Sequence, residues 1–157
     1  FAWFFRFARI PMSDFTAGVA RQEALNFNGQ RIAPNICYED LFGEELLGAL
    51  PAATLLVNLS NTAWFGDSLA QPQHLQIAQL RAIETGRVML RATNTGMTAM
   101  VAENGTIAAA LPPFTTAALV VQAQGRTGLT PYARWGNLLA LLIAVGACLT
   151  AWRRKKL

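Results

Sequence analysis

Residues 31–59 read RIAPNICYEDLFGEELLGALPAATLLVNL, and their pattern decides the fold class of the chain. Arg31 to Ile36 has the composition of a strand and delivers Cys37 at its end. A helical stretch follows from about Asp40 to Leu50, and the apolar run Ala53 to Leu59 is typical of a buried strand. Strand, helix and strand in this order predict an α/β sheet whose strand ends lie side by side.

The flanking sequence extends this sheet in both directions. Asn28-Gly29 and Asn104-Gly105 are turn dipeptides that favour two-residue hairpins, and helical spacing predicts a helix that stops near Gly86. The further elements that we expect are a strand at 25–27, a helix at 73–87, a strand at 88–92, a hairpin of 97–103 with 106–111, and a last strand at 118–122. The sequence therefore predicts one α/β domain.

Composition limits the classes of function. The chain has 157 residues, of which 53% are hydrophobic and 14% charged, so a core can form and a disordered chain is excluded. The net charge of +4 arises in a tail in which residues 153–156 are all basic. Because the remaining positive and negative residues balance, we expect no nucleic-acid partner.

A long apolar stretch precedes that tail. Leu138 to Trp152 carries no charge, and counting back to Trp135 gives 18 residues, near the lower limit for a helix that spans a bilayer. The expected domains are thus a body at 1–134, a transmembrane helix at 135–152 and a basic cytoplasmic tail at 153–157, with the body outside that membrane. A buried core helix is the alternative for this stretch.

The N-terminal residues are also unusually apolar. The chain begins at Phe1 inside the aromatic run Phe1-Ala2-Trp3-Phe4-Phe5, which indicates a fragment of a longer protein. This segment could lie in a membrane interface or pack under the sheet, and the sequence leaves both alternatives open.

Cys37 is the candidate nucleophile, and a quiet buried thiol is its alternative. A helix N-terminus would favour the thiolate, whereas the neighbouring carboxylates of Glu39 and Asp40 would disfavour it. His74 is the only histidine, and it is either the base of a cysteine–histidine pair or an ordinary structural residue. Cys148 lies in the apolar stretch, so we expect no disulfide and no metal site.

Four segments carry a family resemblance: NICYEDLFGEELL (35–47), LLVNLSNTAWFGDS (55–68), QHLQIAQLRAIETGRVMLRATNTGMTAMVAENGTI (73–107) and GLTPYARWGN (128–137). Together they resemble the C-terminal half of the apolipoprotein N-acyltransferases, a membrane branch of the nitrilase superfamily. The resemblance covers nearly the whole chain. It implies an αββα sandwich in the bacterial inner membrane, with a periplasmic catalytic domain and no metal or organic cofactor.

The resemblance also implies a chemistry. Cys37 would take an acyl chain from a phospholipid as a thioester and pass it to the N-terminal amine of a diacylglyceryl apolipoprotein, which is covalent catalysis. The Tyr38 N–H would stabilise the oxyanion, and Glu39 would order the site. The residues that match the loop facing the active site are Asn61, Trp64 and Phe65.

Two departures limit this transfer of roles. Thr62 stands where the family usually has aspartate, and the family's glutamate base and lysine lie in its earlier half. We therefore expect the isolated fragment to be inactive and to fold poorly, because its sheet would expose unpaired edges and apolar faces. Two alternatives remain, namely a membrane-tethered amidase of the nitrilase type and a non-catalytic module anchored to the membrane.

Overall fold

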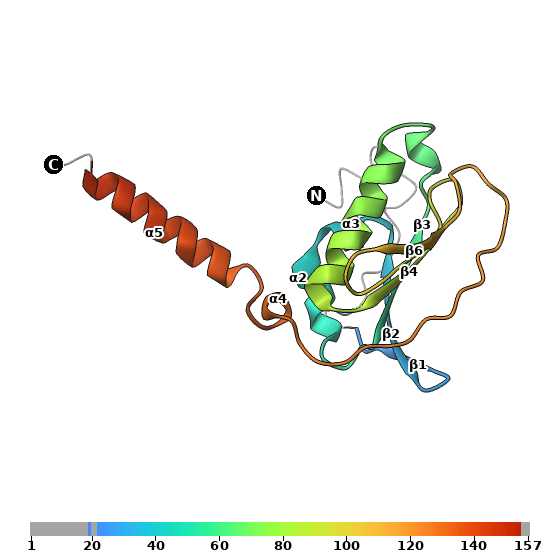
Figure 1. The fold of residues 1–157 in the computed structure, drawn as a ribbon, viewed down its shortest axis with the longest axis horizontal. Helices are drawn as coiled ribbons and strands as arrows, with labels where there is room; N and C mark the ends of the chain where they lie inside the picture. Colours follow the sequence, from blue (N-terminus) through green and yellow to red (C-terminus); the bar gives the residue numbers. More distant parts are fainter. Residues whose placement is uncertain (1–18, 20–21, 155–157) are drawn as a thin grey trace, which may run out of the picture.

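The computed structural model describes residue 19 and residues 22–154. Within these ranges a layered body carries one long helix, α5 (Leu138–Arg154), which projects away from it (Figure 1). The expectations for the N-terminal aromatic segment and for the last lysines concern residues outside the described ranges.

One sheet of six strands organises the body, in the order β1-β2-β3-β4-β5-β6. The central strands β2, β3 and β4 run parallel, while β1, β5 and β6 are added as antiparallel neighbours. The strands are β1 (Leu25–Phe27), β2 (Gln30–Ile36), β3 (Leu55–Ser60), β4 (Val88–Thr93), β5 (Ala99–Val101) and β6 (Ile107–Ala110). The prediction of an α/β sheet is confirmed.

Both Asn-Gly dipeptides lie in hairpins, but only Asn28-Gly29 forms the predicted two-residue turn, since residues 102–106 separate β5 from β6. Asn28 and Gly29 have φ angles of 47° and 78°, the left-handed values that a tight turn between β1 and β2 requires. Gly105 has φ 82° in the turn between β5 and β6, and its N–H donates to the Ala102 carbonyl at 2.8 Å. These turns set the register of the outer strands.

Helix α3 (Ala70–Thr85) packs across one face of the sheet (Figure 1). It ends as predicted at Gly86, whose φ of 63° closes the helix by a left-handed cap. The buried apolar residues of the core are Ala33, Leu46, Ala53, Leu56, Leu75, Ala78, Ala82, Met89, Ala99 and Val101. The helix contacts the sheet mainly at β4 and β5.

The helix predicted for residues 40–50 is wrong in detail. The chain instead forms the 3-10 turn η1 (Cys37–Leu41), a single α-helical turn α2 (Gly43–Leu46) and a second 3-10 turn η2 (Leu47–Ala49). Phe42 breaks the path with φ −99° and ψ 83°, and Gly43 then passes so close to the Arg81 guanidinium that a Cβ would lie 2.2 Å from it. Packing of this segment against α3 therefore overrides the preference of residues 40–50 for a continuous helix.

The strand predicted for residues 118–122 is also wrong. After β6 the chain runs without regular structure until α4 (Pro131–Trp135). It returns to the body where the Arg126 N–H donates to the Thr54 carbonyl at 2.9 Å. Apolar residues at 118–122 are not sufficient for a strand, because a strand also needs a neighbour to pair with. The sheet ends at β6, and residues 118–122 do not extend it.

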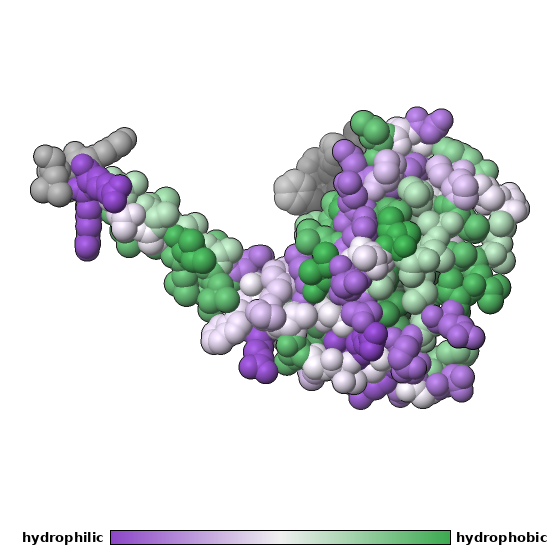
Figure 2. Space-filling view, viewed as in Figure 1, coloured by the Kyte–Doolittle hydropathy of each residue, from purple (hydrophilic) through white to green (hydrophobic). Residues whose placement is uncertain are grey.

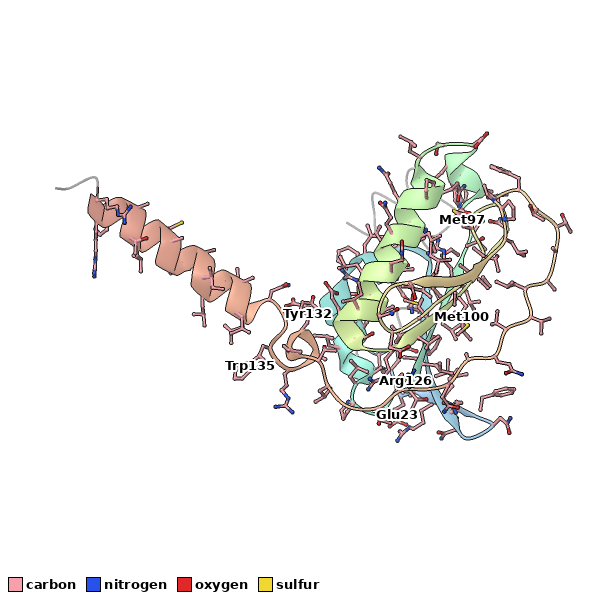
Figure 3. All side chains as sticks on the ribbon, viewed as in Figure 1. Glu23, Met97, Met100, Arg126, Tyr132 and Trp135 are labelled. Atoms are coloured by element: carbon pink, nitrogen blue, oxygen red, sulfur yellow. The ribbon has the colours of Figure 1, made fainter. Side chains whose placement is uncertain are left out.

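The C-terminal stretch differs from the predicted continuous helix over 135–152. Gly136 has φ 52° and separates α4 from α5, so the long helix begins three residues later than expected and includes two arginines. Tyr132 and Trp135 lie on α4, between the body and α5 (Figure 3). No helix in the described residues combines the length and the apolar character needed to cross a membrane.

Candidate active site

Cys37 stands at the sharp bend where β2 ends and η1 begins. It is half-buried, and its φ of 53° lies in the left-handed region that is costly for a residue with a Cβ. Two hydrogen bonds hold the bend, because the Ile36 N–H donates to the Glu39 carboxylate at 2.6 Å and the Asn58 amide donates to the Cys37 carbonyl at 3.0 Å. These two contacts hold Cys37 in its left-handed conformation directly after β2.

A row of polar residues crosses the sheet beneath this bend. Asn35, Asn58 and Arg91 occupy paired positions on β2, β3 and β4, and all three are buried on the face that α3 covers. The Asn58 amide donates to the Asn35 side-chain oxygen at 2.6 Å, and Ser60 donates to the Asn58 oxygen. Buried polar groups are costly unless they are paired, and within the described residues Asn35 Nδ2 lacks a partner, so this row is unusual for the interior of a sheet.

Asp40 joins η1 to both α3 and β4. Its side chain is completely buried, and one oxygen lies 2.9 Å from His74 Nε2 while the other accepts from Arg91 Nη1 at 3.2 Å. Arg91 Nη1 also donates to the His74 carbonyl at 3.4 Å. Burial lowers the pKa of Arg91, and the negative charges of Asp40 and of Cys37 as a thiolate act in the opposite direction.

An apolar pocket of about 460 Å³ opens beside Cys37. Its walls come from η1, from α3 and from the turn η3 (Ala63–Phe65) that follows β3. Trp64 and Phe65 are 77% and 53% exposed, so apolar surface extends from the pocket to the outside of the molecule. The lining residues are Cys37, Tyr38, Leu41, Trp64, Phe65, Ala70, Gln73, His74 and Ile77.

The loop before η3 lies against the cysteine. Cys37 Sγ is 3.9 Å from the Asn61 carbonyl oxygen, and the Asn61 side-chain oxygen accepts from the Asn94 amide at 2.8 Å. Thr62 is buried, with its hydroxyl 3.2 Å from the Thr95 hydroxyl. Thr62 therefore holds the loop to the segment that follows β4.

The structure brings four of the six candidate residues into the pocket wall, namely Cys37, Tyr38, Trp64 and Phe65. The Glu39 carboxylate accepts a hydrogen bond from the Ile36 N–H, and the Asn61 carbonyl lies beside the thiol. His74 lines the same pocket as Cys37, but its Nε2 lies 2.9 Å from the Asp40 carboxylate, and the described residues show no hydrogen bond between His74 and Cys37.

Sequence reasoning missed the roles of Asn35, Asn58, Asp40 and Arg91. Each asparagine and the arginine stands as one polar residue inside an apolar run, and such a residue in a predicted buried strand was the signal available.

A thiol at a strand end and at the wall of a pocket is accessible to a substrate carbonyl, as covalent catalysis by cysteine requires. A model of the carbon-nitrogen hydrolase family matches residues 8–132, and the chain belongs to this family. Among its relatives are apolipoprotein N-acyltransferases of Nitrosomonas europaea and Chromobacterium violaceum. They are 52% and 50% identical to it over 99% and 98% of the chain. The chain spans only 32% and 30% of the length of these two relatives.

Solved structures show the same fold at lower identity. An amidase from Nesterenkonia sp. AN1 matches with a TM-score of 0.54 and 22% identity, over 64% of this chain and 42% of that one. A carbon-nitrogen hydrolase from Helicobacter pylori G27 matches with a TM-score of 0.54 and 16% identity, over the same 64% and 42%. These likenesses establish the nitrilase-like fold.

Proposed function

We propose that this chain is the nucleophile-bearing part of an apolipoprotein N-acyltransferase. The observation that carries the proposal is the position of Cys37, on a strained bend at the wall of an apolar pocket of about 460 Å³. An acyl chain held in such a pocket presents its carbonyl to the thiol, whereas a small polar amide would find few polar partners there. The name of the two relatives, apolipoprotein N-acyltransferase, favours transfer of the acyl group to an apolipoprotein over hydrolysis.

The reaction proceeds in two transfers. The Cys37 thiolate attacks the carbonyl carbon of a phospholipid ester, a C–S bond forms, the C–O bond breaks, and the lysophospholipid oxygen takes a proton. The N-terminal amine of a diacylglyceryl apolipoprotein then attacks the thioester. A C–N bond forms, the C–S bond breaks, and the proton of the amine leaves as the thiol is restored.

Within this scheme Cys37 is the nucleophile and the Tyr38 N–H an oxyanion donor. Glu39 keeps the bend in shape through the Ile36 N–H, and the Asn61 carbonyl fixes the thiol. Trp64 and Phe65 receive the acyl chain at the mouth of the pocket. The general base and the cation that stabilises the oxyanion come from a part of the full-length protein outside this chain.

Helix α5 supports attachment to a membrane. None of its residues is buried, its surface is apolar along most of its length, and Arg153 and Arg154 end it (Figure 2). Exposed apolar surface has a lower free energy in lipid than in water. We therefore place α5 in the bacterial inner membrane, with the body on the periplasmic side.

The test is acyl transfer by the full-length protein that contains this chain. The wild type and Cys37→Ser are incubated with a phospholipid labelled in its acyl chain and with a synthetic diacylglyceryl lipopeptide. We expect labelled N-acylated lipopeptide from the wild type only. Hydrolysis of short amides by the wild type, with no transfer to the lipopeptide, would support an amidase instead, and neither activity would support a non-catalytic module.

A further inference from the structure

Helix α4 is connected to the body by a hydrogen bond at each end. At its start, the Thr130 hydroxyl accepts from the Ala133 N–H at 3.0 Å and donates to the carbonyl of Glu84, in the last turn of α3. Just after its end, the Asn137 N–H donates to the Glu44 carboxylate of α2 at 3.1 Å. The short helix therefore joins α3 and α2 to the beginning of α5.

The Glu44 contact caps α5 from outside that helix. Asn137 begins α5, because its carbonyl accepts from the Leu141 N–H at 2.9 Å. In a capping box, a glutamate three residues further along the same helix binds the N–H of such a residue. Position 140 is alanine, and the carboxylate comes instead from Glu44, 93 residues away along the chain. The carboxylate also faces the positive end of the helix dipole, where a negative charge is favourable.

Gly136 makes this cap possible. Its φ of 52° turns the chain between α4 and α5, and a Cβ at this position would lie 2.9 Å from Glu44 Oε1. The glycine thus lets the carboxylate approach the backbone, but it also gives the connection more conformational freedom than any other residue would. The hydrogen bond of Glu44 restrains the direction of α5 at a point where the backbone itself does not.

The elements that hold α4 are also walls of the pocket. Glu44 follows Cys37 by seven residues, and η1, which begins at Cys37, contributes to the pocket wall. The pocket residues of α3 lie no later than Ile77, whereas its last turn binds α4 through the Glu84 carbonyl. Because α3 is a continuous helix, Ile77 and Glu84 keep a separation of about 10 Å along its axis. The pocket walls, α4 and the beginning of α5 therefore form one connected unit, with α4 between the body and α5 (Figure 3).

We propose that Glu44 is a positioning residue that caps α5 from the body and thereby fixes the angle between the pocket walls and this helix. The proposal rests on the proposed function, in which α5 lies in the membrane and Cys37 takes an acyl chain from a phospholipid. With the angle fixed, the mouth of the pocket keeps one orientation to the bilayer that supplies the acyl chain. Without the cap, α5 rotates about Gly136, and a phospholipid in the bilayer reaches Cys37 less often.

The first measurement is the distance between the body and α5. The full-length protein is placed in lipid nanodiscs and carries spin labels at Cys148 of α5 and at Asn104→Cys, in the exposed turn between β5 and β6. Cys37→Ser and replacement of the cysteines outside this chain by serine leave only these two labels. Pulsed electron paramagnetic resonance then gives the distribution of distances.

We expect one narrow distribution for the protein that retains Glu44. Glu44→Ala broadens it, and Glu44→Gln restores it largely, because the amide oxygen still accepts from the Asn137 N–H. Glu44 is exposed, so neither change removes a core contact. Glu45→Ala, which removes the neighbouring exposed carboxylate, is the matched control and leaves the distribution narrow.

The second measurement compares two acyl donors in protein that retains Cys37. Acylation of Cys37 is followed by mass spectrometry with a phospholipid of the nanodisc and, in detergent, with p-nitrophenyl butyrate, a small ester that does not come from a bilayer. Glu44→Ala slows acylation by the phospholipid about fivefold, as expected for the loss of one helix cap. Its rate with the small ester stays within about twofold of that of the wild type, because the pocket and the thiol are unchanged.

Two results would overturn the proposal. The first is a distribution for Glu44→Ala as narrow as that for Glu45→Ala. The second is a phospholipid rate that does not fall, or that falls only together with the rate for the small ester, since Glu44 would then not act through the orientation of the pocket.

The distance measurement requires no acyl transfer. A protein that transfers no acyl group but shows the broadening in Glu44→Ala would refute the proposed function and retain Glu44 as the cap that directs α5. A protein that transfers acyl groups without the broadening would retain the proposed function and refute the role of Glu44.

Discussion

The side-chain amide of Asn58 on β3 donates a hydrogen bond of 3.0 Å to the main-chain carbonyl of Cys37, the residue that follows β2. The same amide binds Asn35 at 2.6 Å, and Ser60 donates to the Asn58 oxygen. One side chain therefore joins two parallel strands and fixes the backbone from which the nucleophile projects. This contact makes the geometry of Cys37 dependent on a residue that never touches the pocket.

Asn58→Ala is expected to destabilise the protein and to weaken the site together. The change leaves polar groups of Asn35, Ser60 and Cys37 without this partner, at about 1–3 kcal/mol for each buried group. We expect a lower Tm and slower acylation of Cys37. Asn104→Ala, in the exposed turn between β5 and β6, is the control, and equal Tm values for the two variants would contradict the account.

Filling the pocket should exclude long acyl chains. Ile77 lines the pocket on α3, and a tryptophan at this position would occupy part of its volume of about 460 Å³. We expect Ile77→Trp to slow acylation by a long-chain phospholipid about tenfold, since overfilling typically costs about 1–3 kcal/mol, and to affect a short-chain donor much less. Leu80→Trp, on an exposed part of the same helix, serves as the control. An equal loss with both donors would argue against this pocket as the acyl site.

Glu84 should make stability depend on pH in an unusual direction. Burial raises its pKa above the ordinary value of 4.5, against the effect of Arg81. The folded protein then binds more protons than the unfolded chain, so this contribution is present below pH 4.5 and is lost as the pH rises through the raised pKa.

We therefore expect the Tm of Glu84→Gln, relative to that of the wild type, to increase as the pH rises from about 4 to about 7. Thermal unfolding followed by fluorescence measures this difference, with the exposed Glu45→Gln as control. Parallel curves for the wild type and Glu84→Gln would show that burial does not perturb Glu84.

Attachment of α5 to lipid can be tested at Cys148, an exposed free thiol of this helix. In the Cys37→Ser background, a charged maleimide added to intact membranes should label Cys148 slowly, and labelling should become rapid after denaturation. Asn104→Cys in the same background provides an exposed thiol for comparison. Labelling of Cys148 as fast as that of the substituted turn position would place α5 in water.

The order of strands and helices could be predicted because apolar runs and turn residues are local signals. The strands β2, β3 and β4, the end of α3 at Gly86 and both hairpins follow from such signals. Residues 40–50 and 118–122 could not be predicted in this way. In the first case the chain adapts to the Arg81 side chain, and in the second no partner strand continues the sheet.

The site residues that could be predicted are those whose side chains suit the expected chemistry and that match a motif of the family. Cys37, Tyr38, Trp64 and Phe65 were expected, and all four line one pocket. The buried network could not be predicted, because Asp40 and Arg91 are 51 residues apart and meet only through the sheet register. Because Asp40 follows Glu39 directly, the sequence favoured two solvated carboxylates at a helix start and gave no sign that Asp40 would be buried in an ion pair.

The central claim is that Cys37 carries the acyl group. Its most direct test is intact-protein mass spectrometry of the full-length protein, purified from membranes without added thiol, for the wild type and Cys37→Ser. The account predicts an added fatty-acyl mass on the wild type that hydroxylamine removes and that the variant lacks. A wild type that remains unmodified after incubation with phospholipid, or a variant that carries the same mass, would contradict it.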